Sequence, residues 1–181
     1  MSAETERGTA LVIIDTQVGL IEPAYKGKEV LENIGTLIAK ARAAGVPVLY
    51  VQHNEDYEEG LKFGSPQWQI HPAIAPQEGE PVVHKQSPDS FVGTTLQQEL
   101  EKRGIKHLVI VGLQSNYCVD TTSRRSVSAG YDVTLVGDAH TTEDNDVLTA
   151  EQIIAHHNST LNGFWAGGHR IRVRPTSEVV F

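Results

Sequence analysis

The stretch HLVIVGLQSNYCVDTTSRRSVSAGYDVTLV, residues 107–136, contains the pattern that decides the fold. Its first five and last five residues are apolar runs rich in β-branched residues. Runs without polar alternation are typical of strands buried on both faces of a parallel sheet. Residues 118–129 between them predict a helix that ends before Gly130, because glycine commonly follows a helix C-terminus. The order strand, helix, strand predicts a right-handed βαβ unit.

The same alternation extends over the rest of the chain. Further apolar runs predict strands at 10–14, 46–51 and 81–83, and helical periodicity predicts segments that end at Gly45 and Gly104 and one at about 149–161. We therefore expect a single domain over residues 1–181, a three-layer α/β/α sandwich with a mostly parallel central sheet. The tail at 167–181 suggests an added strand or a docking arm.

Charge and cysteine content narrow the class of protein. The 181 residues include 15 Lys and Arg against 23 Asp and Glu, a net charge of −8. Such a chain repels phosphate backbones and anionic lipid, so we expect no nucleic-acid and no membrane partner, and a small-molecule substrate instead. The single cysteine excludes an intramolecular disulfide, and a free thiol suits a reducing compartment, which favours the cytoplasm.

Three reactive side chains follow predicted strands. Ligands of open α/β sheets bind at the carboxyl ends of the strands, where Asp15, Lys85 and Cys118 are expected to meet. A thiol with an ordinary pKa of about 8.5 needs a nearby cation, a base or a helix N-terminus to act as a nucleophile. Lys85 can stabilise the thiolate, and Asp15 can accept the thiol proton and return it to a leaving amine.

Each of these residues also has a structural interpretation. A lone cysteine is most often a small buried apolar residue, a strand-terminal aspartate is often a helix cap, and a lysine is usually solvated. Their coincidence at one sheet edge, in types that complement each other, favours catalysis.

Four segments, in order along the chain, resemble the isochorismatase-like cysteine hydrolases. This family includes nicotinamidases, carbamoylsarcosine and ureidoacrylate amidohydrolases, and isochorismatases. The segments are LVIIDTQVGL at 11–20, GVPVLYVQH at 45–53, VVHKQSPDSFVGTTLQQEL at 82–100 and LVIVGLQSNYCVDTTSRRSVSAGYDVTLVGDA at 108–139. Each alone is a weak signal, but the set is specific. Ser126 departs from the alanine that the family often has nearby.

The resemblance implies that Asp15, Lys85 and Cys118 form a catalytic triad. It also implies a non-proline cis peptide at 113–114, which turns the Gln114 N–H toward the Cys118 N–H to form an oxyanion hole. The implied reaction is hydrolysis of an amide, ureido or carbamoyl C–N bond through a Cys118 acyl-enzyme.

Two other functions stay open at this point. One is vinyl ether hydrolysis by an isochorismatase, but the resemblance implies that such enzymes commonly lack this cysteine. The other is a non-catalytic thiol redox sensor, although the chain has no second cysteine to resolve a sulfenic acid.

The chain has eight histidines, which raises the question of a metal. Nicotinamidases, by resemblance, have a D-x-H element after the second strand, and His53 stands here in the place of its aspartate. Adjacent His156 and His157 point about 100° apart on a helix, so they cannot chelate one ion from the same face. We predict no required metal and no cofactor, and leave open weak binding near His53 and His71.

Four residues are expected to bind the substrate. The resemblance implies that Gln17 lines the site, and Phe91, Trp68 and Tyr117 are the aromatic residues expected nearest to it. Phe91 could equally pack in the core. Trp68 lies in a loop at 53–79 that is long for a compact domain, so we expect this loop to act as a lid or to set specificity.

The C-terminal part suggests self-association. The stretch LNGFWAGG at 161–168 and the apolar end Val179, Val180 and Phe181 are more than one small domain is expected to bury. We therefore expect a homo-oligomer, although scattered apolar surface residues are normal.

Overall fold

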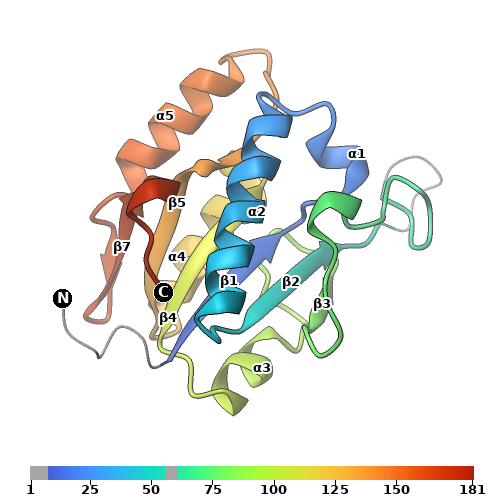
Figure 1. Cartoon of the computed structure of the whole chain (residues 1–181). Coiled ribbons are helices and arrows are strands. Elements are labelled where there is room, and N and C mark those ends of the chain that lie inside the picture. The colour runs from blue at the N-terminus through green and yellow to red at the C-terminus, as the bar shows by residue number, and fades with distance from the viewer. Residues whose placement is uncertain (1–7, 56–60) are drawn as a thin grey trace.

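The computed structural model describes residues 8–55 and 61–181. In these ranges seven strands form one sheet in the order β3-β2-β1-β4-β5-β7-β6 (Figure 1). Neighbouring strands are parallel except for the pair β6 and β7. The strands are β1 (Thr9–Ile14), β2 (Val48–His53), β3 (Val82–Lys85), β4 (His107–Leu113), β5 (Asp132–Thr141), β6 (Trp165–Ala166) and β7 (His169–Arg174). The mostly parallel sheet is thus confirmed.

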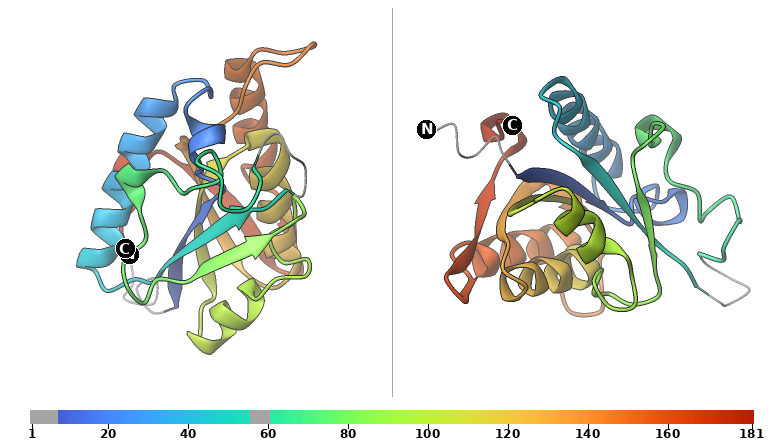
Figure 2. Two further views of the ribbon diagram at one scale, coloured as in Figure 1. Left: turned by 90° about the vertical axis from the view of Figure 1, so that its right-hand side faces the viewer. Right: turned by 90° about the horizontal axis from the view of Figure 1, so that it is seen from below.

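Helices cover both faces of this sheet (Figure 2). One face packs on α2, where Ile34 and Leu37 are fully buried, and the other packs on α3, α4 and α5, where Leu100 and Leu161 are fully buried. The three-layer sandwich is therefore confirmed. The helices are α1 (Val18–Ile21), α2 (Gly27–Ala43), α3 (Leu96–Lys102), α4 (Asp120–Ser128) and α5 (Ala150–Leu161), with short turns η1 (Pro72–Ile74), η2 (Ser115–Val119) and η3 (Thr176–Glu178).

Several elements differ from their predicted bounds. β2 continues to His53, and the helix predicted at 118–129 is preceded by the π-turn η2, so that Cys118 lies inside the turn and not at a helix start. β5 continues to Thr141 past a bulge, because Ile110 of β4 pairs with Leu135 but Gly112 pairs with His140. The predicted added strand in the tail is confirmed as β7, which pairs parallel with β5.

The strand order places a topological switch point between β1 and β4. The chain proceeds from β1 toward β2 and β3 on one side, and from β4 toward β5 on the other. Ligands bind at the carboxyl ends of strands at such a point. The two strands approach closely there: a Cβ on Gly112, whose φ is +120°, would lie 2.0 Å from the Ile14 carbonyl oxygen. Glycine at 112 thus permits the backbone contact next to Asp15.

In the described part of the chain, no helix has the length and apolar character that a membrane span requires.

Candidate active site

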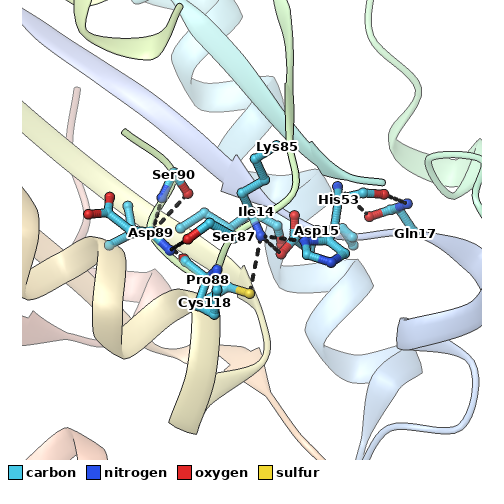
Figure 3. A network of polar contacts seen from close by, with 12 residues as sticks. Ile14, Asp15, Gln17, His53, Lys85, Ser87, Pro88, Asp89, Ser90 and Cys118 are labelled. Carbon is cyan, nitrogen blue, oxygen red and sulfur yellow. Dashed lines mark hydrogen bonds and ion pairs between the residues drawn. The ribbon is translucent and has the colours of Figure 1, made fainter. Parts of the chain in front are cut away.

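Asp15, Lys85 and Cys118 meet at the carboxyl ends of the strands (Figure 3). The Lys85 Nζ lies 2.7 Å from Asp15 Oδ2 and 3.2 Å from Cys118 Sγ. The side chains of Lys85 and Asp15 are buried, with exposed fractions of 0% and 1%, whereas Cys118 is partly exposed. A buried ammonium therefore contacts both a carboxylate and a partly exposed thiol.

Local structure fixes each member of this group. Asp15 follows β1 with a φ of +47°, which is a left-handed conformation. Residues other than glycine rarely adopt this conformation, and those that do are often found at functional sites. Lys85 is the last residue of β3, and the loop after it is tied to α4 because Ser90 Oγ lies 2.8 Å from Thr122 Oγ1. This contact holds the end of β3 beside the helix that follows Cys118.

The electrostatics of the thiol differ from the sequence expectation. Burial, and next the Asp15 carboxylate, raise the pKa of Cys118 to about 12, whereas the charge of Lys85 lowers it. Burial outweighs the ammonium because it removes water from the thiolate. The surroundings of Cys118 thus favour the thiol over the thiolate in the substrate-free protein.

A fourth residue, His53, belongs to the same cluster. Its Nδ1 lies 3.0 Å from the Lys85 Nζ, and its ligand nitrogen, Cys118 Sγ and an Asp15 oxygen all lie within 4.8 Å of one another. Sequence analysis considered His53 only as a metal ligand. The signal that could have found it is its place at the end of β2, which the predicted strand stopped short of.

These three groups could in principle ligate a metal ion. All three, however, contact the Lys85 ammonium, which already provides a positive charge among them. A divalent ion here would have to displace a buried cation that is paired with Asp15, which is unfavourable. The second histidine left open, His71, caps η1 by accepting the Ala73 N–H at 3.2 Å. The residues present do not fit a metal, and no chemistry is derived through one.

The Gln17 side chain connects the main chain of His53 to that of Trp68, and we call this set of hydrogen bonds the Gln17 brace. Gln17 Nε2 donates to the carbonyl oxygens of His53 at 2.9 Å and Trp68 at 2.8 Å, and its Oε1 accepts the His53 N–H at 2.9 Å. Gln52 Nε2 also donates to the Trp68 carbonyl at 2.8 Å. These bonds fasten the described part of the loop, 61–79, to the sheet, since residues 56–60 of it lie outside the described ranges. The Gln17 amide is occupied by main chain, and the residue is fully buried.

The three aromatic residues lie in different surroundings. Phe91 is 9% exposed, packs in the core and stacks on Tyr131, with ring centroids 6.1 Å apart. The Trp68 Nε1–H donates to Asn54 Oδ1, and the indole ring stacks on His84. Because neighbouring residues of a strand point to opposite faces, the His84 side chain lies on the face of β3 opposite to Lys85. Tyr117 is 55% exposed and precedes Cys118 in η2.

The peptide bond between Leu113 and Gln114 is cis, as the resemblance implied. Beneath the following turn runs a buried polar chain that sequence analysis missed. Ser115 Oγ lies 2.7 Å from His140 Nδ1, and His140 Nε2 lies 2.8 Å from Asn158 Oδ1. Burial lowers the pKa of His140 to about 4, so the ring is neutral at pH 7. This chain links the turn that bears Gln114 and Cys118 to β5 and α5.

Comparison with known proteins agrees with this architecture. The family model described as the isochorismatase domain matches residues 9–154. The secreted isochorismatase effector Isc1 of Verticillium dahliae is 35% identical over 161 residues, which cover 84% of this chain and 83% of the effector. The ureidoacrylate amidohydrolase RutB of Klebsiella pneumoniae is 30% identical over 155 residues, 64% of this chain and 66% of that enzyme. The crystal structure of an isochorismatase from Pseudomonas putida KT2440 matches with a TM-score of 0.88 and 29% identity, covering 96% of this chain and 90% of that one.

The fold and these matches define a hydrolase built on a three-layer α/β sandwich. The chain belongs to the isochorismatase family, as the resemblance of its motifs predicted.

Proposed function

We propose that this protein is a cysteine hydrolase that cleaves the C–N bond of an amide, ureido or carbamoyl group in a small molecule through an acyl-enzyme on Cys118. The observation that carries the proposal is the Lys85 Nζ, 2.7 Å from Asp15 Oδ2 and 3.2 Å from Cys118 Sγ. A proton acceptor, a cation and a nucleophile are in contact, which is the combination that covalent acyl transfer requires. Similarity to an amidohydrolase supports the choice of a C–N bond.

Acylation begins when the Cys118 sulfur attacks the carbonyl carbon. The thiol proton passes to Asp15, an S–C bond forms, and the carbonyl electron pair moves onto oxygen. We assign the stabilisation of this oxyanion to the N–H groups of Gln114 and Cys118, where loss of one such donor typically costs about 3 kcal/mol. The C–N bond then breaks, the nitrogen takes the proton held by Asp15, and an amine or ammonia leaves a thioester behind.

Deacylation reverses the roles of the same groups. A water molecule gives a proton to Asp15 and attacks the thioester carbon, and the C–S bond breaks with its electron pair returning to Cys118. The sulfur regains the proton from Asp15, and the acid product leaves. Lys85 stabilises the sulfur whenever it carries negative charge.

The raised pKa of Cys118 bears on the alternative of a redox sensor. Sensor cysteines are low-pKa, accessible thiolates. Burial and the Asp15 carboxylate instead raise the pKa of Cys118 to about 12. A thiol that loses its proton to a neighbouring carboxylate only as it attacks a substrate is suited to acyl transfer and poorly suited to sensing peroxide.

A screen for released ammonia over small amides, ureides and N-carbamoyl compounds tests the proposal. We expect at least one compound to be hydrolysed, and Cys118→Ala and Cys118→Ser to lose turnover while they keep the wild-type circular dichroism spectrum. Ser128→Ala, an exposed change on α4, is the control and should retain full activity. A reduction of only a few-fold in Cys118→Ala would show that the thiol is not the nucleophile.

A further inference from the structure

His53 contacts the Lys85 ammonium but has no part in the steps above. Its Nδ1 lies 3.0 Å from Nζ, a distance close to those of the contacts from Nζ to Asp15 Oδ2 and Cys118 Sγ. In Figure 3 the dashed lines from His53 and Cys118 reach the lysine from different directions. Lys85 Nζ thus has hydrogen-bonding partners in His53 and Cys118 and an ion-pair partner in Asp15, and these three contacts restrict the rotation of the ammonium about its last bond.

The contact defines the proton positions on the imidazole. A lysine ammonium has donors and no acceptor, so the Nδ1 facing it must be unprotonated. The single proton of a neutral ring is then on Nε2, which lies 3.7 Å from Glu55 Oε1. Protonation of Nδ1 would place two cations in contact.

The surroundings keep the ring neutral. Burial, and then the charge of Lys85, lower the pKa of His53, while the carboxylates of Asp15 and Glu55 raise it by less. Among residues 8–55 and 61–181, the charged and titratable groups that face the ring are these three and the Cys118 thiol. The neutral imidazole adds an acceptor without adding charge to a cluster whose cation and anion already balance.

The main chain at His53 is held by the Gln17 side chain and by the neighbouring strand. Both its N–H and its carbonyl oxygen bond to the Gln17 amide, at 2.9 Å each. His53 is also the register partner of Lys85 in the parallel pair of β2 and β3, and the Asn54 N–H donates to the Lys85 carbonyl at 2.8 Å. The Gln17 brace therefore fixes the imidazole relative to the lysine.

We propose that His53 is a positioning residue, whose Nδ1 accepts one N–H of Lys85 and so directs the ammonium toward Asp15 and Cys118. Without this acceptor the ammonium loses a partner in a buried site and turns away from the sulfur, so the thiolate is less stabilised. The effect on turnover rests on the function proposed above, but the effect on the thiol does not.

The test measures the rate at which iodoacetamide alkylates Cys118 between pH 7 and 11, detected by intact mass. Cys118 is the single cysteine of the chain, so the added mass reports this thiol alone. His53→Leu removes the acceptor, whereas His53→Asn keeps an oxygen close to the Nδ1 position. His156→Leu, on the exposed side of α5, is the control for loss of an imidazole.

We expect His53→Leu to slow alkylation by about ten-fold at each pH in this range, a size typical of losing a hydrogen bond to a charged group. His53→Asn and His156→Leu should stay within about three-fold of wild type. On a hydrolysed amide, kcat of His53→Leu should fall about ten-fold with KM nearly unchanged. If His53→Leu does not fold, His53→Gln, whose amide lies near the Nε2 position instead, replaces it.

Unchanged alkylation in His53→Leu would overturn the proposal. So would an equal loss in His53→Asn and His53→Leu, because the loss would then follow the ring and not the acceptor. If no amide is hydrolysed by the wild type while His53→Leu alkylates ten-fold more slowly, the role of His53 stands and the proposed function fails.

Discussion

Lys85 and Asp15 form a buried ion pair, with 2.7 Å between Nζ and Oδ2 and less than 2% of either side chain exposed. Removing one partner of such a pair leaves an uncompensated charge in the interior, which typically costs about 3–5 kcal/mol. Replacing both partners by neutral groups avoids that cost. The stability of the fold therefore depends on this ion pair, which also lies at the centre of the site.

We predict that Lys85→Met lowers the free energy of unfolding by about 3 kcal/mol or more, and that Asp15→Asn with Lys85→Met recovers much of this loss. Urea unfolding at pH 7 measures both. Arg174→Ala, which breaks an exposed contact 3.8 Å long with Glu178, should cost less than about 1 kcal/mol. A double variant no more stable than Lys85→Met would contradict the buried pair as the cause.

We predict that the protein loses stability in acid because of the buried His140 side chain. Its pKa is lowered from 6.5 to about 4 by burial, so its contribution to stability is complete above pH 6.5 and is lost as the pH falls to about 4. The difference corresponds to about 3 kcal/mol. Urea unfolding between pH 7 and 4 should show this decline, and His140→Gln should reduce it. Equal slopes in both proteins would exclude His140 as the origin.

Much of the site could be predicted from the sequence. Ligands bind at the carboxyl ends of the strands, and these ends are located once the strands are. Apolar runs located β1 and β3, and so Asp15 and Lys85 could be assigned from sequence. The same rule missed His53, because the predicted strand at 46–51 ended two residues before β2 does. The apolar run ends at Val51, whereas the strand continues through Gln52 and His53, two polar residues whose partners only the folded protein brings near.

The Ser115 to His140 contact could not be predicted for a different reason. It depends on a bulge that moves β5 from pairing Leu135 with Ile110 to pairing His140 with Gly112. Gly137 within the bulge accepts the Asn158 side-chain N–H at 2.9 Å through its carbonyl oxygen. A bulge of this kind leaves no periodic signal in the sequence. Phe91 could not be placed for another reason, because an aromatic residue is equally compatible with a pocket wall and with the core.

Activity is predicted to survive exhaustive chelation, because the groups that could ligate a metal already contact the Lys85 ammonium. The measurement is ammonia release after dialysis against a strong chelator, compared with untreated enzyme. Loss of activity that zinc, iron or manganese restores would contradict the prediction, and Asp15, His53 and Cys118 would then be the ligands to replace.

Self-association remains a proposal. In the structure, only some of the apolar residues that suggested it are exposed. Val179 is buried at 5% exposed, so the tail accounts for part of its own apolar surface, but Trp165 and Val180 are 73% and 71% exposed. We predict a homo-oligomer in sedimentation at micromolar concentration, weakened by Trp165→Ser or Val180→Ser. A mass of one chain that does not change with concentration would contradict it.

The acyl-enzyme is tested most directly by intact-mass spectrometry of protein quenched with acid during turnover of a hydrolysed amide. The account predicts an added mass equal to the acyl group, located on the peptide that contains Cys118, the single cysteine of the chain, and no adduct in Cys118→Ala. Continued turnover by Cys118→Ala, with the wild-type thiol unmodified throughout the reaction, would contradict it.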